Sequence, residues 1–508
     1  MKVLVANRGE IALRIIRACQ EHGAPTVAVY ADCDRRAPYV QQADEAVGLG
    51  SNEPSESYLA IHKIVAIAQQ IGADAIHPGY GFLAENADFA RAVEQAGLTF
   101  IGPSSDVIAL MGGKTAARHV AERAGVPTVP GTDGPLPDDA TDAAIAEAGA
   151  LIGYPLFVKA VAGGGGKGMR LVHEPGLLMR AVQGARSEAA SAFGNGDVYL
   201  ERCIERGRHI EVQLLADKYG TVVPFVEREC SIQRRHQKVI EETPSPVINE
   251  QTRRALADAA TRLAEEVGYT NAGTIECLFD ESSNEFYFLE MNTRLQVEHP
   301  ITEMVTGIDL VRWQLRIAEG ERLTIDQETA LVPKGHAIEC RVYAEDPAAG
   351  FMPSPGVLTF HRLPEGPGVR VDCGVEPGFE VPIYYDSMIS KVITHACDRP
   401  ASIDRMLRAL SEYDVTGVPT TIPMFRWLLA TSDFGAARFD TTYLDGVLLS
   451  GAGVPFVDTQ PNDELEDVVV LAAAVSVGLG GNRVVRTTKT NPGRRGDWRH
   501  IARAEGLR

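Results

Sequence analysis

Acidic and amide side chains that could bind a metal ion are concentrated in the segment 276–299. Its first part alternates like a β-strand, a polar turn follows at 282–284, and a second strand then returns beside the first. On such a hairpin Glu276 and Glu290 lie on paired strands, and Asn292 faces the same side. Their oxygens are the hard ligands that Mg²⁺ prefers beside substrate phosphates. We therefore predict a metal site here, in preference to a solvated strand end with incidental charges.

A second candidate site is the run of four glycines at 163–166, which Lys167 follows directly. A predicted strand at 156–160, which carries Lys159, precedes it, and another strand begins at Met169. Successive glycines let a ligand approach the backbone closely, and their N–H groups can form an anion-binding nest. The order of strand, glycines and strand predicts a flap over phosphates, although a flexible hairpin tip has the same composition.

Basic side chains cluster at 234–238 (Arg-Arg-His-Gln-Lys), inside an acidic protein. Two interpretations stay open for this run, a solvated face and a site for an anion. A strand at 198–201, followed by Arg202, Cys203 and Ile204, is a reasonable seat for an adenine, which needs backbone donors and acceptors between apolar walls.

Regular elements that would position these residues begin near the N-terminus. Strands alternate with helices from residue 2 to 101, which predicts a parallel sheet with helices on both faces. The loops at 7–10 and 77–81 follow two of these strands. Ligands of parallel sheets bind at such strand ends, but the glycines in both loops are also explained by tight turns.

Two further units follow the parallel sheet. A mixed unit begins near Tyr154 and includes a helix predicted at 302–318. A third unit begins near Lys334, and its short strands, among them 356–360, are typical of a small antiparallel domain.

Composition sets limits on the class of protein. A chain of 508 residues predicts about three domains, and the net charge of −19 argues against nucleic acid as the main partner. No signal peptide precedes the first strand, and the longest apolar run, 468–479, is too short to span a bilayer. The eight cysteines include no C-x-x-C pair. We expect a cytoplasmic protein that is not bound to a membrane.

Taken together, these segments resemble biotin carboxylase, the ATP-grasp component of acetyl-CoA, propionyl-CoA and pyruvate carboxylases. The resemblance extends over about residues 1–447, with the motifs in the family's order. The motifs that carry it are Asn-Arg-Gly-Glu-Ile-Ala at 7–12, His-Pro-Gly-Tyr-Gly-Phe-Leu at 77–83, the glycine run 163–169, the basic run 234–238, and Glu-Met-Asn-Thr-Arg-Leu-Gln-Val-Glu-His-Pro at 290–300.

The resemblance implies a role for each matching position. The implied nucleotide and cofactor positions are Lys114, Lys159, Gly165, Gly166, Lys167, Glu201, Ile204, His209, His236, Gln296 and Val297, the last of which also belongs to the bicarbonate and biotin pocket. The implied metal ligands for Mg²⁺ or Mn²⁺ are Glu276, Glu290 and Asn292. The implied catalytic residues are Lys238, Arg294, Glu298 and Arg341.

The resemblance also implies a mechanism. Glu298 would deprotonate bicarbonate while Arg294 and Lys238 hold the anion. Attack on the γ-phosphate of ATP would give carboxyphosphate and then CO₂. Arg341 would stabilise the ureido oxygen of biotin as its N1 attacks CO₂.

The implied architecture is an N-terminal parallel-sheet domain at 1–113, an ATP-grasp domain with a glycine-rich flap at 114–333, and an antiparallel C-terminal domain at 334–447. Residues 448–508 form an acidic linker and a basic tail that resembles the tails of longer acyl-CoA carboxylase subunits. No lysine lies in an Ala-Met-Lys-Met context, so biotin should be a substrate on a separate carrier. We expect a homodimer that works with a biotin carboxyl carrier protein and a carboxyltransferase subunit.

Three alternatives remain at this stage. The biotin-carboxylating chain of a two-subunit pyruvate carboxylase would have the same motifs. Another ATP-grasp ligase would lack the combination of Lys238, Arg294 and Glu298, and a scaffold subunit that only binds nucleotide would lack Glu298 or a metal ligand.

Overall fold

The structure is a computed structural model, and it describes residues 1–161 and 169–451. The glycine run with Gly165, Gly166 and Lys167 lies outside the described residues. The predictions of a phosphate flap and of a basic tail therefore lie outside them too.

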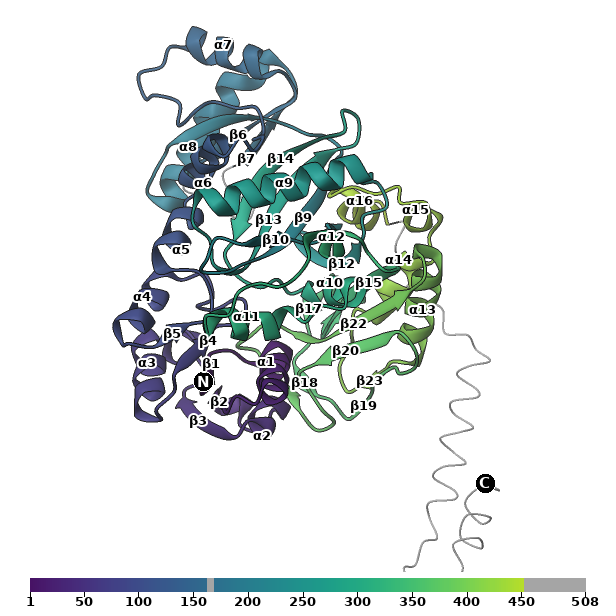
Figure 1. The fold of residues 1–508 in the computed structure, drawn as a ribbon. Helices are drawn as coiled ribbons and strands as arrows, with labels where there is room; N and C mark the ends of the chain where they lie inside the picture. The colour runs from purple at the N-terminus through teal and green to yellow at the C-terminus, as the bar shows by residue number, and fades with distance from the viewer. Residues whose placement is uncertain (162–168, 452–508) are drawn as a thin grey trace, which may run out of the picture. The chain divides into compact units, whose positions relative to one another are not determined.

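Helices and strands of the described residues are labelled as in Figure 1. The helices are α1 (Gly9–His22), α2 (Pro38–Gln42), α3 (Ile61–Gln70), α4 (Ala87–Gln95), α5 (Ser105–Gly112), α6 (Lys114–Arg123), α7 (Asp142–Ile152), α8 (Leu178–Phe193), α9 (Glu250–Glu266), α10 (His299–Thr306), α11 (Leu310–Ala318), α12 (Gln327–Leu331), α13 (Arg399–Glu412), α14 (Ile422–Leu429), α15 (Ser432–Gly435) and α16 (Tyr443–Leu449). The main strands are β1 (Val3–Val5), β2 (Thr26–Ala31), β3 (Glu45–Gly50), β4 (Ala75–His77), β5 (Thr99–Phe100), β6 (Leu156–Ala160), β7 (Met169–Val172), β8 (Val198–Arg202), β9 (Gly207–Ala216), β10 (Val222–Pro224), β11 (Arg228–Arg234), β12 (Gln237–Thr243), β13 (Asn271–Asp280), β14 (Glu285–Asn292), β15 (His336–Tyr343), β20 (Val369–Cys373) and β22 (Met388–Ala396).

The N-terminal region is the predicted parallel sheet, with strand order β3-β2-β1-β4-β5. Side chains of β1 alternate between its two faces: Val3 and Val5 join the core built with α1, whereas Leu4 joins the core built with α3 and α4. Helices therefore cover both faces (Figure 1). The loops 7–10 and 77–81 follow the neighbouring strands β1 and β4 at the same edge of the sheet.

One predicted helix is wrong. The segment 302–318 is two helices, α10 and α11, because Gly307 adopts a left-handed conformation with φ of 74° and ends the first helix. Asp309 then begins the second helix, since its side chain accepts a hydrogen bond from the backbone N–H of Arg312. Apolar residues continue across this break with helical spacing, and this pattern misled the prediction.

The long strands of the central and C-terminal regions form one sheet, in the order β14-β13-β9-β11-β12-β15-β22-β20, and β10 pairs with β9. The C-terminal region is antiparallel, as predicted, but β15 pairs with β12, so its long strands extend the central sheet. The predicted strand 356–360 is divided between β18 (Gly356–Val357) and β19 (Phe360–Arg362), which pair with different strands.

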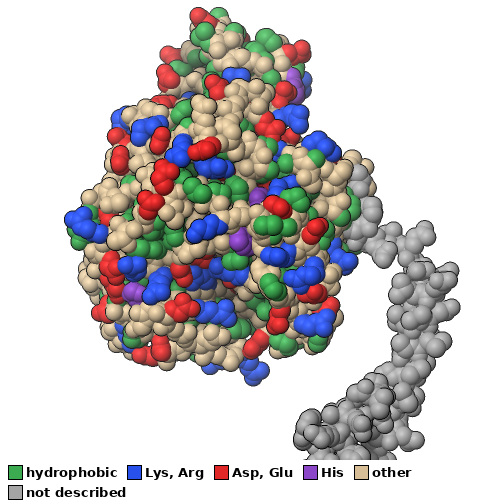
Figure 2. Space-filling model, turned by 45° about the vertical axis from the view of Figure 1, so that its right-hand side comes forward, with side chains coloured by type: hydrophobic (Ala, Val, Ile, Leu, Met, Phe, Trp, Pro, Cys, Tyr) green, Lys and Arg blue, Asp and Glu red, His purple; other side chains and the backbone are tan. Residues whose placement is uncertain are grey.

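A separate three-stranded sheet, in the order β7-β6-β8, packs with α7 and α8 in the upper part of Figure 1. On the face of the molecule in Figure 2, acidic and basic side chains are interspersed. None of the helices within 1–161 and 169–451 is both long enough and apolar enough to cross a bilayer.

His77 ends β4 and holds the start of the loop 77–81. Its ring is fully buried, and its Nδ1 accepts a hydrogen bond from the backbone N–H of Gly79 at 3.1 Å. Burial lowers the pKa of His77 to about 3, although the nearby side chain of Gln314 acts in the opposite direction. The folded protein therefore keeps this ring neutral at pH values where an unfolded chain protonates it.

We predict that His77 makes the protein sensitive to acid. The unfolded state binds more protons than the folded state between pH 6.5 and about 3, so the stabilising contribution is lost as the pH falls below 6.5. Between pH 7 and pH 5 the wild type should lose about 2 kcal/mol more of its free energy of unfolding than His77→Asn, which keeps an acceptor for Gly79. Urea unfolding at the two pH values measures this. The exposed control His62→Asn should behave as wild type, and equal losses in all three proteins would contradict the prediction.

Candidate active site

A row of three carboxylates crosses the central sheet. The predicted hairpin is confirmed, with Glu276 of β13 directly opposite Glu290 of β14. On its other side Glu276 lies opposite Glu211 of β9. Like charges in such positions repel one another, so this row needs cations. We did not predict Glu211, although alternation along β9 places it on the same face as His209.

The ammonium of Lys238 supplies one cation. Its Nζ lies 2.5 Å from Glu211 Oε2, 2.8 Å from Glu276 Oε1 and 2.9 Å from Glu298 Oε1. Burial works against the charged ammonium, but these three carboxylates raise the pKa of Lys238 well above its ordinary value. For Lys238 a solvated face is therefore excluded, because its ammonium is enclosed by three carboxylates, and anion binding there stays a prediction.

Glu298 is fully buried between two cations. Its second oxygen, Oε2, accepts a hydrogen bond from Arg341 Nη2 at 3.0 Å. Burial alone would raise the pKa of Glu298, but Lys238 and Arg341 hold it well below its ordinary value. Arg341 also forms an ion pair from Nε to Glu241 at 2.7 Å, a partner that no local sequence signal indicated. The carboxylate of Glu298 therefore stays ionised without contact with bulk water.

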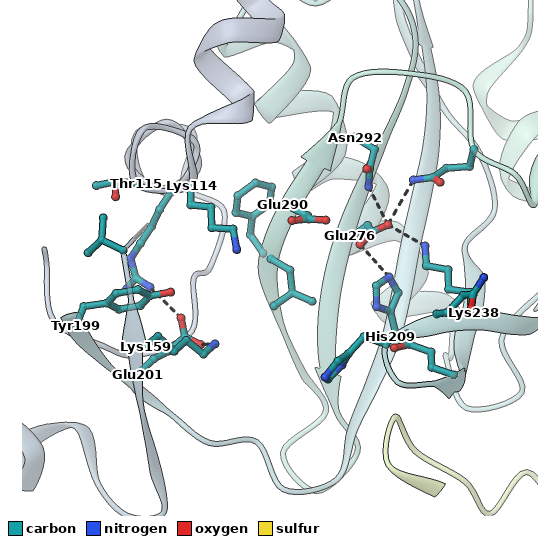
Figure 3. Close-up of a pocket in the computed structure, with 18 of the residues that line it drawn as sticks. Lys114, Thr115, Lys159, Tyr199, Glu201, His209, Lys238, Glu276, Glu290 and Asn292 are labelled. Atoms are coloured by element: carbon teal, nitrogen blue, oxygen red, sulfur yellow. Dashed lines mark hydrogen bonds and ion pairs between the residues drawn. The ribbon is translucent and has the colours of Figure 1, made fainter. Parts of the chain in front are cut away.

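The predicted metal ligands meet beside this cluster. Asn292 Nδ2 donates a hydrogen bond to Glu276 Oε1 at 2.8 Å, and His209 Nε2 lies 3.2 Å from the other oxygen of Glu276 (Figure 3). Glu276 and Asn292 are buried, which excludes a solvated strand end for these two, whereas Glu290 is exposed at the edge of the site. Burial and then the charge of Glu276 raise the pKa of Glu290, while Lys114 acts against them. Three hard oxygen donors with excess negative charge fit Mg²⁺.

Lys238 and Arg294 both donate hydrogen bonds to oxygen atoms of the predicted metal ligands. Glu276 Oε1 accepts from Lys238, and Asn292 Oδ1 accepts from Arg294 Nη2 at 3.1 Å. A metal ion and these two cations would therefore compete for the same oxygen atoms.

A cavity of about 550 Å³ opens over this site. Most predicted positions line it, namely Lys114, Lys159, Glu201, His209, His236, Lys238, Glu276, Glu290, Asn292, Arg294, Gln296, Val297 and Arg341. Ile204 is not among the lining residues that the structure describes, and Glu298 lies beneath the cavity surface, behind Lys238 and Arg341. The cavity therefore joins the positions implied for nucleotide, metal and anion.

One end of this cavity has apolar walls that the sequence did not reveal. Val161, Tyr199, Phe288 and Leu289 line it from three separate segments, and Thr132–Pro135 contribute a loop. Nearby, the ammonium of Lys159 on β6 forms an ion pair with Glu201 on the neighbouring β8 (Figure 3). No spacing rule connects such distant lining residues.

A second cavity, of about 500 Å³, shares Gln237, Arg294, Val297 and Arg341 with the first. The remainder of its wall comes from residues 7–11 and 80–82 and from aromatic residues of the C-terminal region, Tyr343, Tyr384 and Tyr385. The loops at the strand ends thus line a cavity. They are also tight turns, since Gly9, Gly79 and Gly81 have positive φ. The tight-turn interpretation is therefore confirmed, and ligand binding by these loops stays a prediction.

Comparison with known proteins gives consistent results along most of the chain. Family models match residues 1–108 (biotin carboxylase, N-terminal domain), 113–326 (carbamoyl-phosphate synthase L chain, ATP binding domain) and 339–446 (biotin carboxylase C-terminal domain). Biotin carboxylase 1 of Bacillus subtilis is 50% identical, over 87% of this chain and 98% of that one. A pyruvate carboxylase subunit from Methanothermobacter thermautotrophicus is 51% identical, over 87% of this chain and 89% of that one.

Solved structures give the same result. The biotin carboxylase domain of the 2-oxoglutarate carboxylase from Hydrogenobacter thermophilus, a dimer in complex with MgADP, ADP and bicarbonate, has a TM-score of 0.81 at 49% identity, covering 88% of this chain and 97% of that one. Biotin carboxylase from Campylobacter jejuni has a TM-score of 0.81 at 45% identity, covering 88% and 98%. This chain therefore belongs to the biotin carboxylase family.

Proposed function

We propose that the residues at the junction of the two cavities carboxylate biotin with ATP and bicarbonate. ATP occupies the first cavity, the ureido ring of biotin enters the second, and bicarbonate lies between them. The observation that carries this proposal is the buried, ionised carboxylate of Glu298, which Lys238 and Arg341 hold from two sides. Solved relatives bound to MgADP and bicarbonate support the same set of substrates.

The first cavity supplies positive charge for the phosphates of ATP. Lys114, Lys159, His209 and His236 line it, and Glu201 holds Lys159 from the neighbouring strand. The apolar walls suit an adenine, which stacks on aromatic and aliphatic surfaces. We keep Gly165, Gly166, Lys167 and Ile204 in this role on the family resemblance alone.

Glu276, Glu290 and Asn292 would hold Mg²⁺ or Mn²⁺. A divalent cation offsets the negative charge that the row of carboxylates and the transferring phosphoryl group would otherwise share. Gln296 supports this set, because its Nε2 donates to Glu276 Oε1 at 3.3 Å.

Glu298 acts as the general base. Arg294 and Lys238 hold bicarbonate, Glu298 takes its proton, and the bicarbonate oxygen attacks the γ-phosphorus as ADP leaves. The resulting carboxyphosphate releases CO₂ and phosphate. The released phosphate takes the proton from N1 of biotin, and N1 then attacks CO₂ while Arg341 stabilises the negative charge on the ureido oxygen. When an anion binds, it partly offsets the positive charge of Lys238 and Arg341, and this raises the proton affinity of Glu298.

Biotin is proposed to arrive on a separate carrier protein, and a carboxyltransferase subunit then uses the carboxyl group. A homodimer is the proposed assembly, because a solved relative at 49% identity is a dimer of such domains. The cytoplasm is the proposed location. The 51% identical pyruvate carboxylase subunit keeps pyruvate among the candidate final acceptors, and the domain boundaries 113/114, 333/334 and 447/448 remain proposals.

Glu298→Gln should abolish most activity without loss of MgATP binding. The amide keeps the shape of the side chain but cannot accept a proton, so bicarbonate-dependent ATP cleavage should fall about 10²- to 10⁴-fold. A coupled assay for ADP release measures the rate, and nucleotide binding by calorimetry is the control for folding. Turnover near the wild-type rate would exclude Glu298 as the base.

Glu290→Gln should raise the Mg²⁺ concentration needed for half-maximal activity. Loss of a residue that only hydrogen-bonds to a metal ligand typically lowers metal affinity roughly 10- to 100-fold. Loss of a ligand itself should cost at least as much. Titration with Mn²⁺, monitored by its paramagnetic resonance in the presence of ADP, measures binding directly. Glu285→Gln, at an exposed position on the same strand, is the matched control. Equal metal affinities for both variants would contradict the assignment.

Biotin should remain absent from this polypeptide after co-expression with a biotin ligase. None of its lysines lies between two methionines, the context that marks a carrier lysine in the family. Intact mass spectrometry checks this, and activity should then require free biotin or an added carrier. A biotin adduct on any lysine of the chain would contradict the separate-carrier proposal.

A further inference from the structure

Glu85 reaches the active site from the N-terminal region. Its Oε2 accepts a hydrogen bond from Arg294 Nε at 2.7 Å, and its Oε1 accepts one from the backbone N–H of Thr293 at 3.0 Å. One carboxylate thus binds both the side chain and the backbone at the start of the loop that carries Glu298.

The turn that presents Glu85 is well anchored. The backbone N–H of Ala84 donates to Gly81 O at 2.9 Å, and that of Asn86 donates to Leu83 O at 3.1 Å. Leu83 and Ala84 are buried, and the side chain of Asn86 begins α4 by accepting from Phe89 N–H. The backbone at Glu85 is therefore fixed by its own turn, and the side chain, which is 38% exposed, extends from there to Thr293 and Arg294.

Among the described residues, Arg294 makes three other hydrogen bonds, all through its Nη atoms, and one of them goes from Nη1 to the backbone oxygen of Leu295 at 3.2 Å. Nη1 donates to Gln296 Oε1 at 2.9 Å, and Nη2 donates to Asn292 Oδ1 at 3.1 Å. Asn292 is a proposed metal ligand, so Nη2 loses this acceptor when the metal takes the oxygen. The contact of Nε with Glu85 involves neither group.

We propose that Glu85 is a positioning residue that holds the Nε edge of Arg294, so that its Nη edge faces bicarbonate. This rests on the proposed function. A planar guanidinium fixed along one edge loses little further freedom when its other donors bind an anion. The negative charge of Glu85 by itself opposes anion binding. A positioning role therefore predicts that removal of Glu85 weakens bicarbonate binding, whereas its charge alone predicts that removal strengthens it.

Glu85→Ala should raise the KM for bicarbonate about two- to fivefold, the usual effect of losing a partly exposed ion pair, and should leave the KM for ATP unchanged. Glu85→Gln keeps acceptor atoms and should show a smaller rise. Asp88→Asn, which removes a charge at an exposed position three residues away, is the matched control and should show no rise. A lower KM for bicarbonate in Glu85→Ala, or a change in Mg²⁺ requirement alone, would overturn the inference.

Hydrogen exchange without substrates provides a test that does not depend on activity. Loss of the acceptor for Thr293 N–H should speed exchange in peptides covering 293–296 in Glu85→Ala, and not in Asp88→Asn. Unchanged exchange there overturns the positioning role even if the KM changes. A wild-type protein without bicarbonate-dependent ATP cleavage would instead contradict the proposed function, and the exchange result would still decide the role of Glu85.

Discussion

Three buried carboxylates share the ammonium of Lys238, and the surrounding sheet is built to make that possible. An ion removed from water costs several kcal/mol unless partners replace its hydration, and removing one partner of a buried pair typically costs about 3–5 kcal/mol. Glu211 and Glu276 come from paired positions on β9 and β13, Glu298 comes from the loop after β14, and Arg228 of β11 closes the row beside Glu211. Each charge is acceptable only because the strand register brings the others to it.

The same network sets the chemistry of the base. A carboxylate whose pKa is held well below its ordinary value is always ionised near neutral pH, but it binds protons weakly. Glu298 therefore gains proton affinity when another anion partly neutralises Lys238 and Arg341. In the proposed mechanism, proton transfer to Glu298 would then be linked to the arrival of bicarbonate. The buried position of Glu298 behind its two cations has the same consequence.

The sequence was sufficient where the signal was local. The hairpin that pairs Glu276 with Glu290 follows from alternation and a polar turn, and the parallel sheet follows from the order of strands and helices. Pairing between distant strands has no such signal. The sequence therefore did not indicate that β15 continues the central sheet, or that Glu241 would pair with Arg341. Glu85 lies about two hundred residues from Arg294 in the chain, and only the fold brings them together.

The central sheet is continuous, and this explains how the cavity proposed for ATP and the cavity proposed for biotin can act as one site. Arg341 of β15 lies directly opposite Lys391 of β22, and Lys391 Nζ donates to the backbone oxygen of Val297 at 2.7 Å. The residue before Glu298, the proposed general base, is therefore held by the C-terminal region. The proposed metal ligands on β13 and β14 belong to the same sheet. A close-packed interior has low compressibility. The distance between the cavity proposed for ATP and the cavity proposed for biotin is therefore fixed by strand spacing and not by the substrates.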